Sequence, residues 1–307
     1  MISNWFKYIA FSFILCCSYI ATSQQEVDTT LVPQIIKPFY KADKGPTVFI
    51  DEIHNNFHTK EGRFKPFSTL LERDGYKVKS LETYDLLNTT DVLVISNAIN
   101  SRNIGNWQQP IHDAFTSEDI QILKNWVEAG GRLLIIADHM PFSGATNTLA
   151  NAFGFNFCDG FAYLSKPEGA SDVFSEENKR LLVSKITDGT YGNSINSVTT
   201  FMGSSFQIPE KAIGILKFKK GDECLEPEIA WQFDENTPSK DLEDSYQGAI
   251  LEFGKGKLAV FGEAAQFTAQ TITIENGTFH VGFNSETAPN NVDFIRNLML
   301  WLSTNEN

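Results

Sequence analysis

Positive charge and long apolar runs are both scarce in this sequence. Its 25 Lys and Arg residues stand against 38 Asp and Glu residues, which gives a formal net charge of −13 over 307 residues. Such an acidic chain is a poor electrostatic partner for nucleic acid or for an anionic membrane surface. No apolar stretch reaches the roughly 20 residues that a membrane-spanning helix needs. We therefore expect no nucleic-acid partner and no membrane span.

Motifs for nucleotide binding and for a Ser or Cys nucleophile are also missing. No Gly-x-Gly-x-x-Gly follows the first predicted strand, and Gly-Lys-Ser or Gly-Lys-Thr does not occur, so nucleotide binding has no support. The strand predicted over 132–138 leads into Asp138 and His139, where a hydrolase of the nucleophile-elbow type carries Ser or Cys.

Residues 1–23 are typical of a cleaved secretory signal peptide. Lys7 precedes an apolar run, and small residues lead up to Ser23, after which a signal peptidase would cut. We therefore expect a periplasmic or secreted protein. A lipid anchor on Cys16 or Cys17 is the alternative.

Cysteine is rare, with four in the whole chain and none at C-x-x-C spacing, which argues against a cysteine-based zinc site. Signal cleavage would leave Cys158 and Cys224. These two either pair in an oxidising compartment or stay as buried thiols, and their spacing does not decide between the two states.

The remaining composition is that of a globular protein. Hydrophobic residues make up 42% and charged residues 21%, which excludes a disordered chain, a collagen-like repeat and a coiled coil. Short β-rich apolar runs alternate with segments of helical periodicity. Strands are predicted over 47–50, 78–81, 91–97, 132–138, 249–253 and 257–261, and helices over 67–71, 116–127, 148–153 and 292–302.

This order of elements predicts an α/β fold with an open, mostly parallel sheet and helices on both faces. Glycines between the last two strands predict a C-terminal hairpin, which a helix follows. We expect a loosely packed polar leader over 24–45 and a single domain over 46–303. Residues 160–225 are interpreted as an elaboration inserted into that domain.

Scarce imidazoles and several acids fall just after the predicted strands. In an open α/β sheet, ligands bind beyond the carboxyl ends of the strands, so the loops that follow the strands form the candidate site. The side chains expected to form a catalytic centre are Asp51, His54, Asp138, His139 and Glu263. Those expected to bind the substrate are Asn55, Asn56, His58, Trp107, Phe142 and Gln270.

Two kinds of chemistry fit this set. Imidazole nitrogens and carboxylate oxygens bind divalent metals, and His54, His139 and Asp138 are the candidate ligands of one such ion. Without a metal, the His and acidic side chains can divide the general acid and base roles, with Glu263 as the proton shuttle. Amides beside flat aromatic faces suit a sugar as well as a catalytic centre.

Three blocks of the sequence resemble an uncharacterised bacterial domain family. They are VFIDEIHNNFHTKEGRFKPFSTLLERDGYKV at 48–78, FTSEDIQILKNWVEAGGRLLIIADHMPFSGA at 115–145 and GKGKLAVFGEAAQFTAQ at 254–270. The family belongs to the class I glutamine amidotransferase-like superfamily, so the resemblance implies a flavodoxin-like fold. True amidotransferases carry a nucleophilic Cys at the elbow, where this chain has Asp138 and His139. Glutamine hydrolysis by a thiol is therefore not expected.

The resemblance also points toward carbohydrate. Relatives in this superfamily include sugar-utilisation proteins, domains appended to glycoside hydrolases, and gliding-motility or transport-associated modules. We interpret the chain as an exported carbohydrate-processing hydrolase, with or without a metal ion. A non-catalytic module that binds a glycan or a partner, in polysaccharide utilisation or at the cell envelope, is the alternative. A structural part of an envelope assembly is a third hypothesis, and fold analogy alone does not choose among them.

Overall fold

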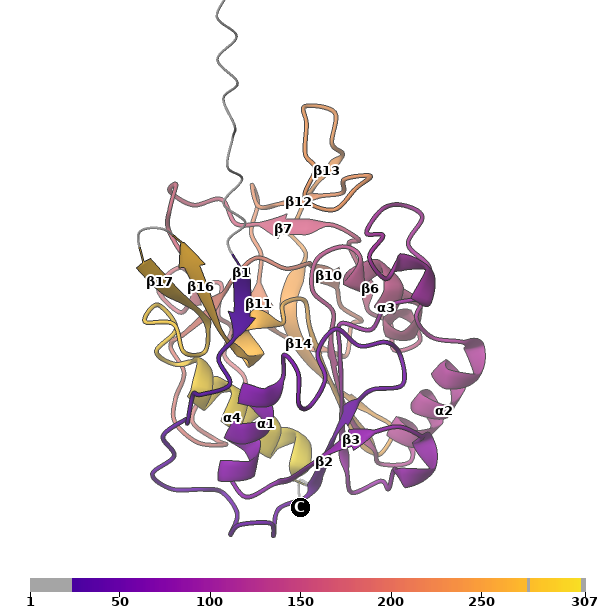
Figure 1. Ribbon diagram of the computed structural model, residues 1–307, viewed down its shortest axis with the longest axis vertical. Coiled ribbons are helices and arrows are strands. Elements are labelled where there is room, and N and C mark those ends of the chain that lie inside the picture. The colour runs from indigo at the N-terminus through magenta and orange to yellow at the C-terminus, as the bar shows by residue number, and fades with distance from the viewer. Residues whose placement is uncertain (1–23, 275–276, 305–307) are drawn as a thin grey trace, which may run out of the picture.

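The structure is a computed structural model that describes residues 24–274 and 277–304 (Figure 1). The predicted signal peptide lies outside the described residues. A nine-stranded sheet forms the centre of the molecule, in the order β3-β2-β4-β5-β15-β14-β10-β6, and β11 pairs with β14 off this path. Across the described ranges, no helix is long and apolar enough to cross a membrane.

One half of the central sheet is parallel and the other half is antiparallel. The parallel strands are β3 (Lys77–Leu81), β2 (Thr47–Asp51), β4 (Val92–Ser96), β5 (Arg132–Ile136) and β15 (Gly256–Phe261). The antiparallel strands are β14 (Tyr246–Phe253), β10 (Phe206–Gln207), β6 (Asn156–Phe157) and β11 (Ile213–Lys217). The predicted α/β class, its parallel strands and the β14–β15 hairpin are confirmed. The sequence did not predict β6 or β10, because strands of two residues carry no periodicity.

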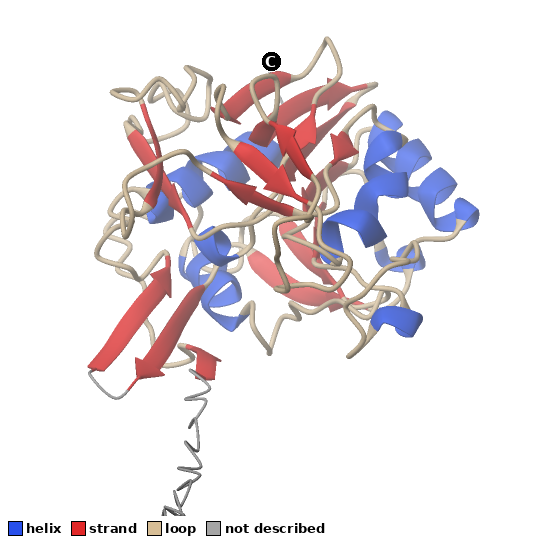
Figure 2. Ribbon diagram, turned by 90° about the horizontal axis from the view of Figure 1, so that it is seen from above, coloured by secondary structure: helices blue, strands red, loops and turns tan. Residues whose placement is uncertain are grey.

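Helices cover both faces of the sheet, as predicted (Figure 2). α1 (Lys65–Arg73) and α4 (Asn291–Ser303) pack on one face, and α2 (Ser117–Glu128) and α3 (Phe142–Asn151) pack on the other. Val48 and Ile50 of β2 enter the core beneath α1 and α4, whereas Phe49 enters the core beneath α2 and α3. Burial on both faces explains why these strands are continuous apolar runs in the sequence.

The starts of α2 and α3 show which helix signals the sequence carries. Thr116 and Asp119 form the reciprocal capping box that their spacing predicts. α3 begins at Phe142, not at Thr148 as expected. Its first turn is capped by the Asp159 carboxylate, which accepts a hydrogen bond from the Gly144 backbone N–H at 2.9 Å. A cap supplied by a residue beyond the end of the helix leaves no local sequence pattern.

Short strands build three smaller sheets around the central one. The first contains β1 (Gln24–Val27), β16 (Ala269–Ile274) and β17 (Gly277–Gly282). The second contains β13 (Ser239–Asp241), β12 (Glu223–Leu225) and β7 (Phe161–Tyr163). The third pairs β8 (Asp172–Ser175) with β9 (Ser197–Thr200). Short 3₁₀ helices are η1 (Tyr84–Leu86), η2 (Ser101–Asn103) and η3 (Ala265–Phe267).

The segments over 24–45 and 160–225 both contribute strands to sheets. The polar leader begins with β1, which pairs antiparallel with β16. Further along it, the Phe39 backbone N–H donates to the Asp74 carboxylate at 2.8 Å. The elaboration over 160–225 is also partly integral, since its strands β10 and β11 belong to the central sheet.

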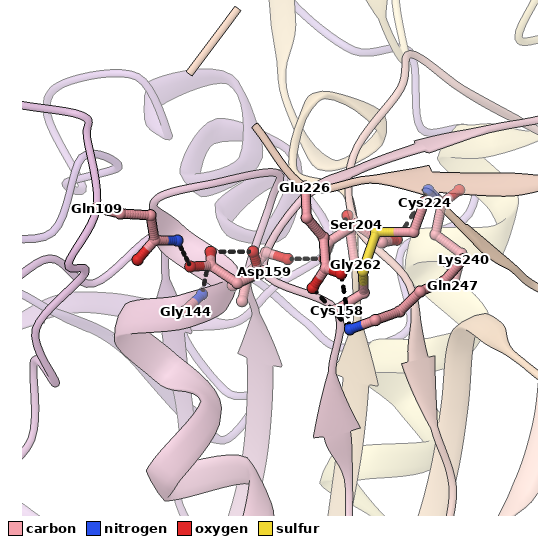
Figure 3. Close-up of a disulfide and its surroundings, with 12 residues drawn as sticks. Gln109, Gly144, Cys158, Asp159, Ser204, Cys224, Glu226, Lys240, Gln247 and Gly262 are labelled. Carbon is pink, nitrogen blue, oxygen red and sulfur yellow. Dashed lines mark hydrogen bonds and ion pairs between the residues drawn. A yellow bond between two sulfur atoms is a disulfide. The ribbon is translucent and has the colours of Figure 1, made fainter. Parts of the chain in front are cut away.

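Cys158 and Cys224 form a disulfide, which decides between the two states left open by the sequence (Figure 3). The bond ties the segment after β6 to β12. The neighbouring residue, Asp159, accepts a hydrogen bond from the Gln109 side-chain amide at 2.9 Å and also caps α3. The disulfide therefore braces segments that lead into the candidate site.

Candidate functional site

The loops that follow the parallel strands meet in one cleft of about 290 Å³. It lies beyond the carboxyl ends of β2, β4, β5 and β15, where an α/β sheet places its ligands. The sequence-derived candidates that line it are His58, Trp107, Asp138, His139, Phe142, Glu263 and Gln270. The small sheet β1-β16-β17 contributes one lining residue from each strand, namely Gln25, Gln270 and Val281. Segments far apart in the chain are thus brought to one edge.

Aromatic rings form much of the wall of this cleft. The Trp107 ring centroid lies 5.3 Å from that of Phe142. The His139 ring stacks on Phe161 at 4.6 Å with 11° between the planes. Trp231 meets the same imidazole edge-on at 4.7 Å. An apolar wall with a few convergent polar groups is the usual composition of a small-molecule site.

His139 is held in one orientation by its own loop. Its Nδ1 lies 2.7 Å from the backbone carbonyl oxygen of Met140, so the N–H of the neutral ring is on Nδ1. This hydrogen bond assigns the tautomer and leaves the Nε2 lone pair available. No described residue forms a hydrogen bond with Nε2, so this nitrogen can accept a hydrogen bond from a ligand hydroxyl.

Glu263 and Asp138 are acidic groups of the same cleft. Glu263 is 1% exposed, and its two oxygens accept hydrogen bonds from the backbone N–H groups of Ala265 at 2.6 Å and Gln266 at 2.8 Å. Burial, and then the negative charge of Asp138, raise the pKa of Glu263 well above its usual value, although these two hydrogen bonds oppose the shift. Glu263 therefore keeps its proton at a pH where an ordinary glutamic acid has lost it.

Asp138 is positioned by the loop after β4. Its backbone N–H donates to Asn97 Oδ1 at 2.9 Å, and its own Oδ1 accepts from the His139 backbone N–H at 2.8 Å. Asn97 has a φ of +49°, in the left-handed region that Asn tolerates better than most residues. The carboxylate thus enters the cleft from a fixed backbone position.

His58 contributes a neutral imidazole. It is 4% exposed, and its Nδ1 is 3.2 Å from Ser96 Oγ. Burial, and then the positive charge of Arg63, lower the pKa of His58 from 6.5 to about 3. The ring packs against Phe64 with centroids 4.6 Å apart. His58 is therefore an uncharged hydrogen-bonding group of the cleft wall and not a proton carrier near neutral pH.

Asp51 and His54 do not line this cleft, contrary to expectation. His54 Nδ1 lies 2.7 Å from Asp51 Oδ2, and its Nε2 lies 3.1 Å from the Tyr84 hydroxyl. The ring packs on Phe115 at 4.2 Å, and Asp119 of α2 is 3.9 Å from Nε2. Both imidazole nitrogens are thus engaged in a buried network beside α2. The sequence placed these residues at the correct sheet edge but could not show which way they turn.

The expected metal-ligand set is not assembled either. His54 is committed to Asp51 and Tyr84, whereas His139 and Asp138 line the cleft. Within residues 24–274 and 277–304, no group of three or more His, Cys, Asp or Glu side chains is arranged to hold a metal ion. The donors present do not fit the predicted metal site.

Asn55 and Asn56 hold the loop after β2 and are not among the lining residues. Asn56 Oδ1 accepts from the His54 backbone N–H at 3.2 Å, and its amide donates to the Ser96 carbonyl oxygen at 3.3 Å. The Asn55 amide donates to the Ile99 carbonyl oxygen at 3.3 Å. Their amides satisfy backbone groups, so they position the site without forming it.

Sequence reasoning missed several lining residues, of which Trp231 and Arg63 are the most informative. Trp231 is 51% exposed and has a φ of +68°, which is rare for a bulky residue. Backbone strain of this kind concentrates at functional sites. Trp231 lies in a loop without periodicity, and Arg63 lies between two predicted elements. No local pattern marked either residue.

No family model matches the sequence, and no curated protein matches it. Among solved structures, the mmIFT52 N-terminal domain is similar, with a TM-score of 0.58 and 14% identity over 85% of this chain and 99% of that chain. This likeness shows a shared fold and nothing about function.

Two further solved structures are more distant. A ThuA-like protein from Bacteroides uniformis has a TM-score of 0.45 and 9% identity, over 89% of this chain and 97% of that chain. A β-galactosidase from Bacillus circulans has a TM-score of 0.42 and 9% identity, over 84% of this chain but 30% of that chain.

Proposed function

We propose that the cleft binds a carbohydrate and that the protein is a hydrolase acting on it. The observation that carries the proposal is a buried, proton-retaining Glu263 beside Asp138 in a cleft walled by aromatic rings. Two carboxyl groups whose environments separate their pKa values are a recurring arrangement for acid and base roles. In glycoside hydrolysis, one carboxylic acid protonates the leaving oxygen while the other carboxylate assists the incoming water.

The residues divide the work as follows. Glu263 gives its proton to the glycosidic oxygen as the C–O bond breaks, and Asp138 takes a proton from the attacking water. The product then carries the water oxygen, and the two carboxyl groups exchange their protons with solvent. His139 Nε2 accepts a hydrogen bond from a sugar hydroxyl, while Trp231 and Trp107 pack against the ring. His58 supports the wall without carrying charge.

A non-catalytic binding module is the second candidate, and a specific observation favours it. Both Glu263 oxygens already accept hydrogen bonds from backbone N–H groups at the start of η3, as the side chain of a structural helix cap does. The half-exposed ring of Trp231 suits ligand binding without any chemistry. In this reading the cleft retains a glycan and Glu263 only holds the loop.

Asp138→Asn separates the two candidates. Because the side chain is partly exposed and keeps its shape, the variant should fold. For a hydrolase we expect reducing-end release from a polysaccharide panel to fall about 10²- to 10⁴-fold while glycan binding persists. Asp85→Asn, which changes an exposed carboxylate of η1, is the matched control and should leave activity unchanged.

Each result has a distinct meaning. Binding without any cleavage by the unaltered protein supports the module and refutes the hydrolase. Cleavage that survives Asp138→Asn refutes the assigned base. Failure to bind or cleave any sugar in the panel refutes the carbohydrate proposal as a whole.

We also propose that the fold is flavodoxin-like and that the protein is exported. Numbered along the chain, the parallel strands β2, β3, β4, β5 and β15 have the spatial order 2-1-3-4-5, which is the flavodoxin-like order. The disulfide supports export, because such bonds persist in oxidising compartments. Amino-terminal sequencing of the protein recovered from culture medium or periplasm tests the predicted cleavage after Ser23.

A further inference from the structure

Arg63 is a cation of the cleft, and none of the described acidic side chains forms an ion pair with it. Its guanidinium lies over the Phe57 ring, with Cζ 4.4 Å from the centroid. No side-chain hydrogen bond or ion pair joins this guanidinium to another residue in the described part of the chain, and burial lowers the pKa of Arg63. A partly buried charge without an anionic partner is costly. A ligand with a negative charge would supply that partner.

Gln270 adds an unpaired polar group to the same cleft. It is 4% exposed, and its Oε1 has no hydrogen-bond partner among the residues that the structure describes. The segment that leads into Gln270 is tied to the segment that carries Arg63, because the Thr268 hydroxyl donates to the Arg63 carbonyl oxygen at 2.5 Å. The Gln270 amide, on β16, therefore lines the same cleft as the Arg63 guanidinium. Most buried polar atoms in proteins have a hydrogen-bond partner, so this oxygen, on a residue that lines the cleft, is a candidate acceptor for a ligand hydroxyl.

We propose that the ligand is an acidic sugar, a uronic acid unit whose carboxylate pairs with Arg63 and whose hydroxyl group donates to Gln270. This inference rests on the carbohydrate function proposed above and names its substrate class. The planar guanidinium matches the two oxygens of a carboxylate. A uronic acid carries that carboxylate beside ring hydroxyls, which supplies both missing partners from one sugar ring. Sulfated sugars share the negative charge and are the competing source.

Matched pairs of oligosaccharides test the proposal by isothermal titration calorimetry. The probes are fragments of pectin, alginate and glucuronoxylan, each compared with its carboxyl-reduced form, which keeps the stereochemistry and loses the charge. Sulfated carrageenan fragments form the competing arm. We expect at least one uronate fragment to bind 10-fold or more tightly than its reduced form, and its affinity to fall as salt is raised.

Substitutions assign the effect to the guanidinium. Arg63→Gln should weaken binding of the uronate fragment about 10- to 100-fold and leave the reduced form unchanged. Arg63→Lys keeps the charge without the planar fork and should lie in between. Arg73→Gln, on the exposed side of α1, is the matched control. Thermal melts of each variant verify that it is folded.

The outcomes separate this inference from the function beneath it. Equal affinity for the charged and reduced forms overturns the role of Arg63 and leaves carbohydrate binding intact. Tighter binding of sulfated than of carboxylated fragments overturns the uronate assignment in favour of sulfate. Absence of binding to every fragment, charged or neutral, overturns the proposed function itself.

Discussion

His58 should make the folded protein sensitive to mild acid, and His58→Gln should remove that sensitivity. The imidazole has a pKa of about 3 when folded and 6.5 in its ordinary state, because burial and then Arg63 disfavour its charged form. Between these values the unfolded chain binds a proton that the folded chain does not. The free energy of unfolding is therefore reduced as the pH falls from 6.5 toward 3.

The size of the effect follows from the two pKa values. From pH 7.5 to pH 5 this single group should lower the free energy of unfolding by about 2 kcal/mol. At pH 5 almost none of the folded protein carries this proton, so protonation of the unfolded chain sets the size of the effect. By pH 4 the loss reaches about 3 kcal/mol. The raised pKa of Glu263 has the opposite effect on the free energy of unfolding, but it acts equally in the wild type and in His58→Gln.

Urea denaturation at several pH values, followed by tryptophan fluorescence, measures this difference. The stability of the wild type relative to His58→Gln should fall by about 2 kcal/mol between pH 7.5 and pH 5, with unchanged m-values. His280→Gln alters an exposed imidazole of β17 and is the control. Parallel stability curves for wild type and His58→Gln would show that the buried imidazole is not kept neutral by its surroundings.

Two further predictions concern parts of the molecule outside the cleft. Replacing Cys158 and Cys224 together by Ser should lower the free energy of unfolding by about 2–4 kcal/mol, because the disulfide closes a loop between residues 66 positions apart. Urea denaturation measures this change, and a loss below about 1 kcal/mol would contradict a stabilising role. Asp51→Asn replaces the carboxyl group that lies 2.7 Å from Nδ1 of buried His54 and should lower the free energy of unfolding by about 1–3 kcal/mol, while sugar affinity and cleavage stay within two-fold. A 10-fold loss of cleavage in the folded variant would return this pair to the reaction centre.

Some of the candidate site could be predicted because it depends on a topological rule. Parallel strands end at the same edge, so the sequence predicts that Asp138, His139 and Glu263 meet there. The same rule selected Asp51 and His54, which also follow a strand. Their side chains nevertheless turn toward α2 and Tyr84, because side-chain direction depends on loop geometry and not on position along the chain.

The sequence by itself determined the alternation of buried strands and helices, the capping box at Thr116 and the edge at which polar side chains gather. These features depend on residues within a few positions of one another, where burial and capping leave a periodic pattern. Only the tertiary structure decided the pairing of Cys158 with Cys224, the start of α3 and the presence of Arg63 and Trp231 in the cleft. Each of these depends on partners distant in the chain, such as Arg63 and Thr268, which are 205 positions apart. Contacts over such separations are fixed by how whole elements pack, and they leave no trace in any short window of sequence.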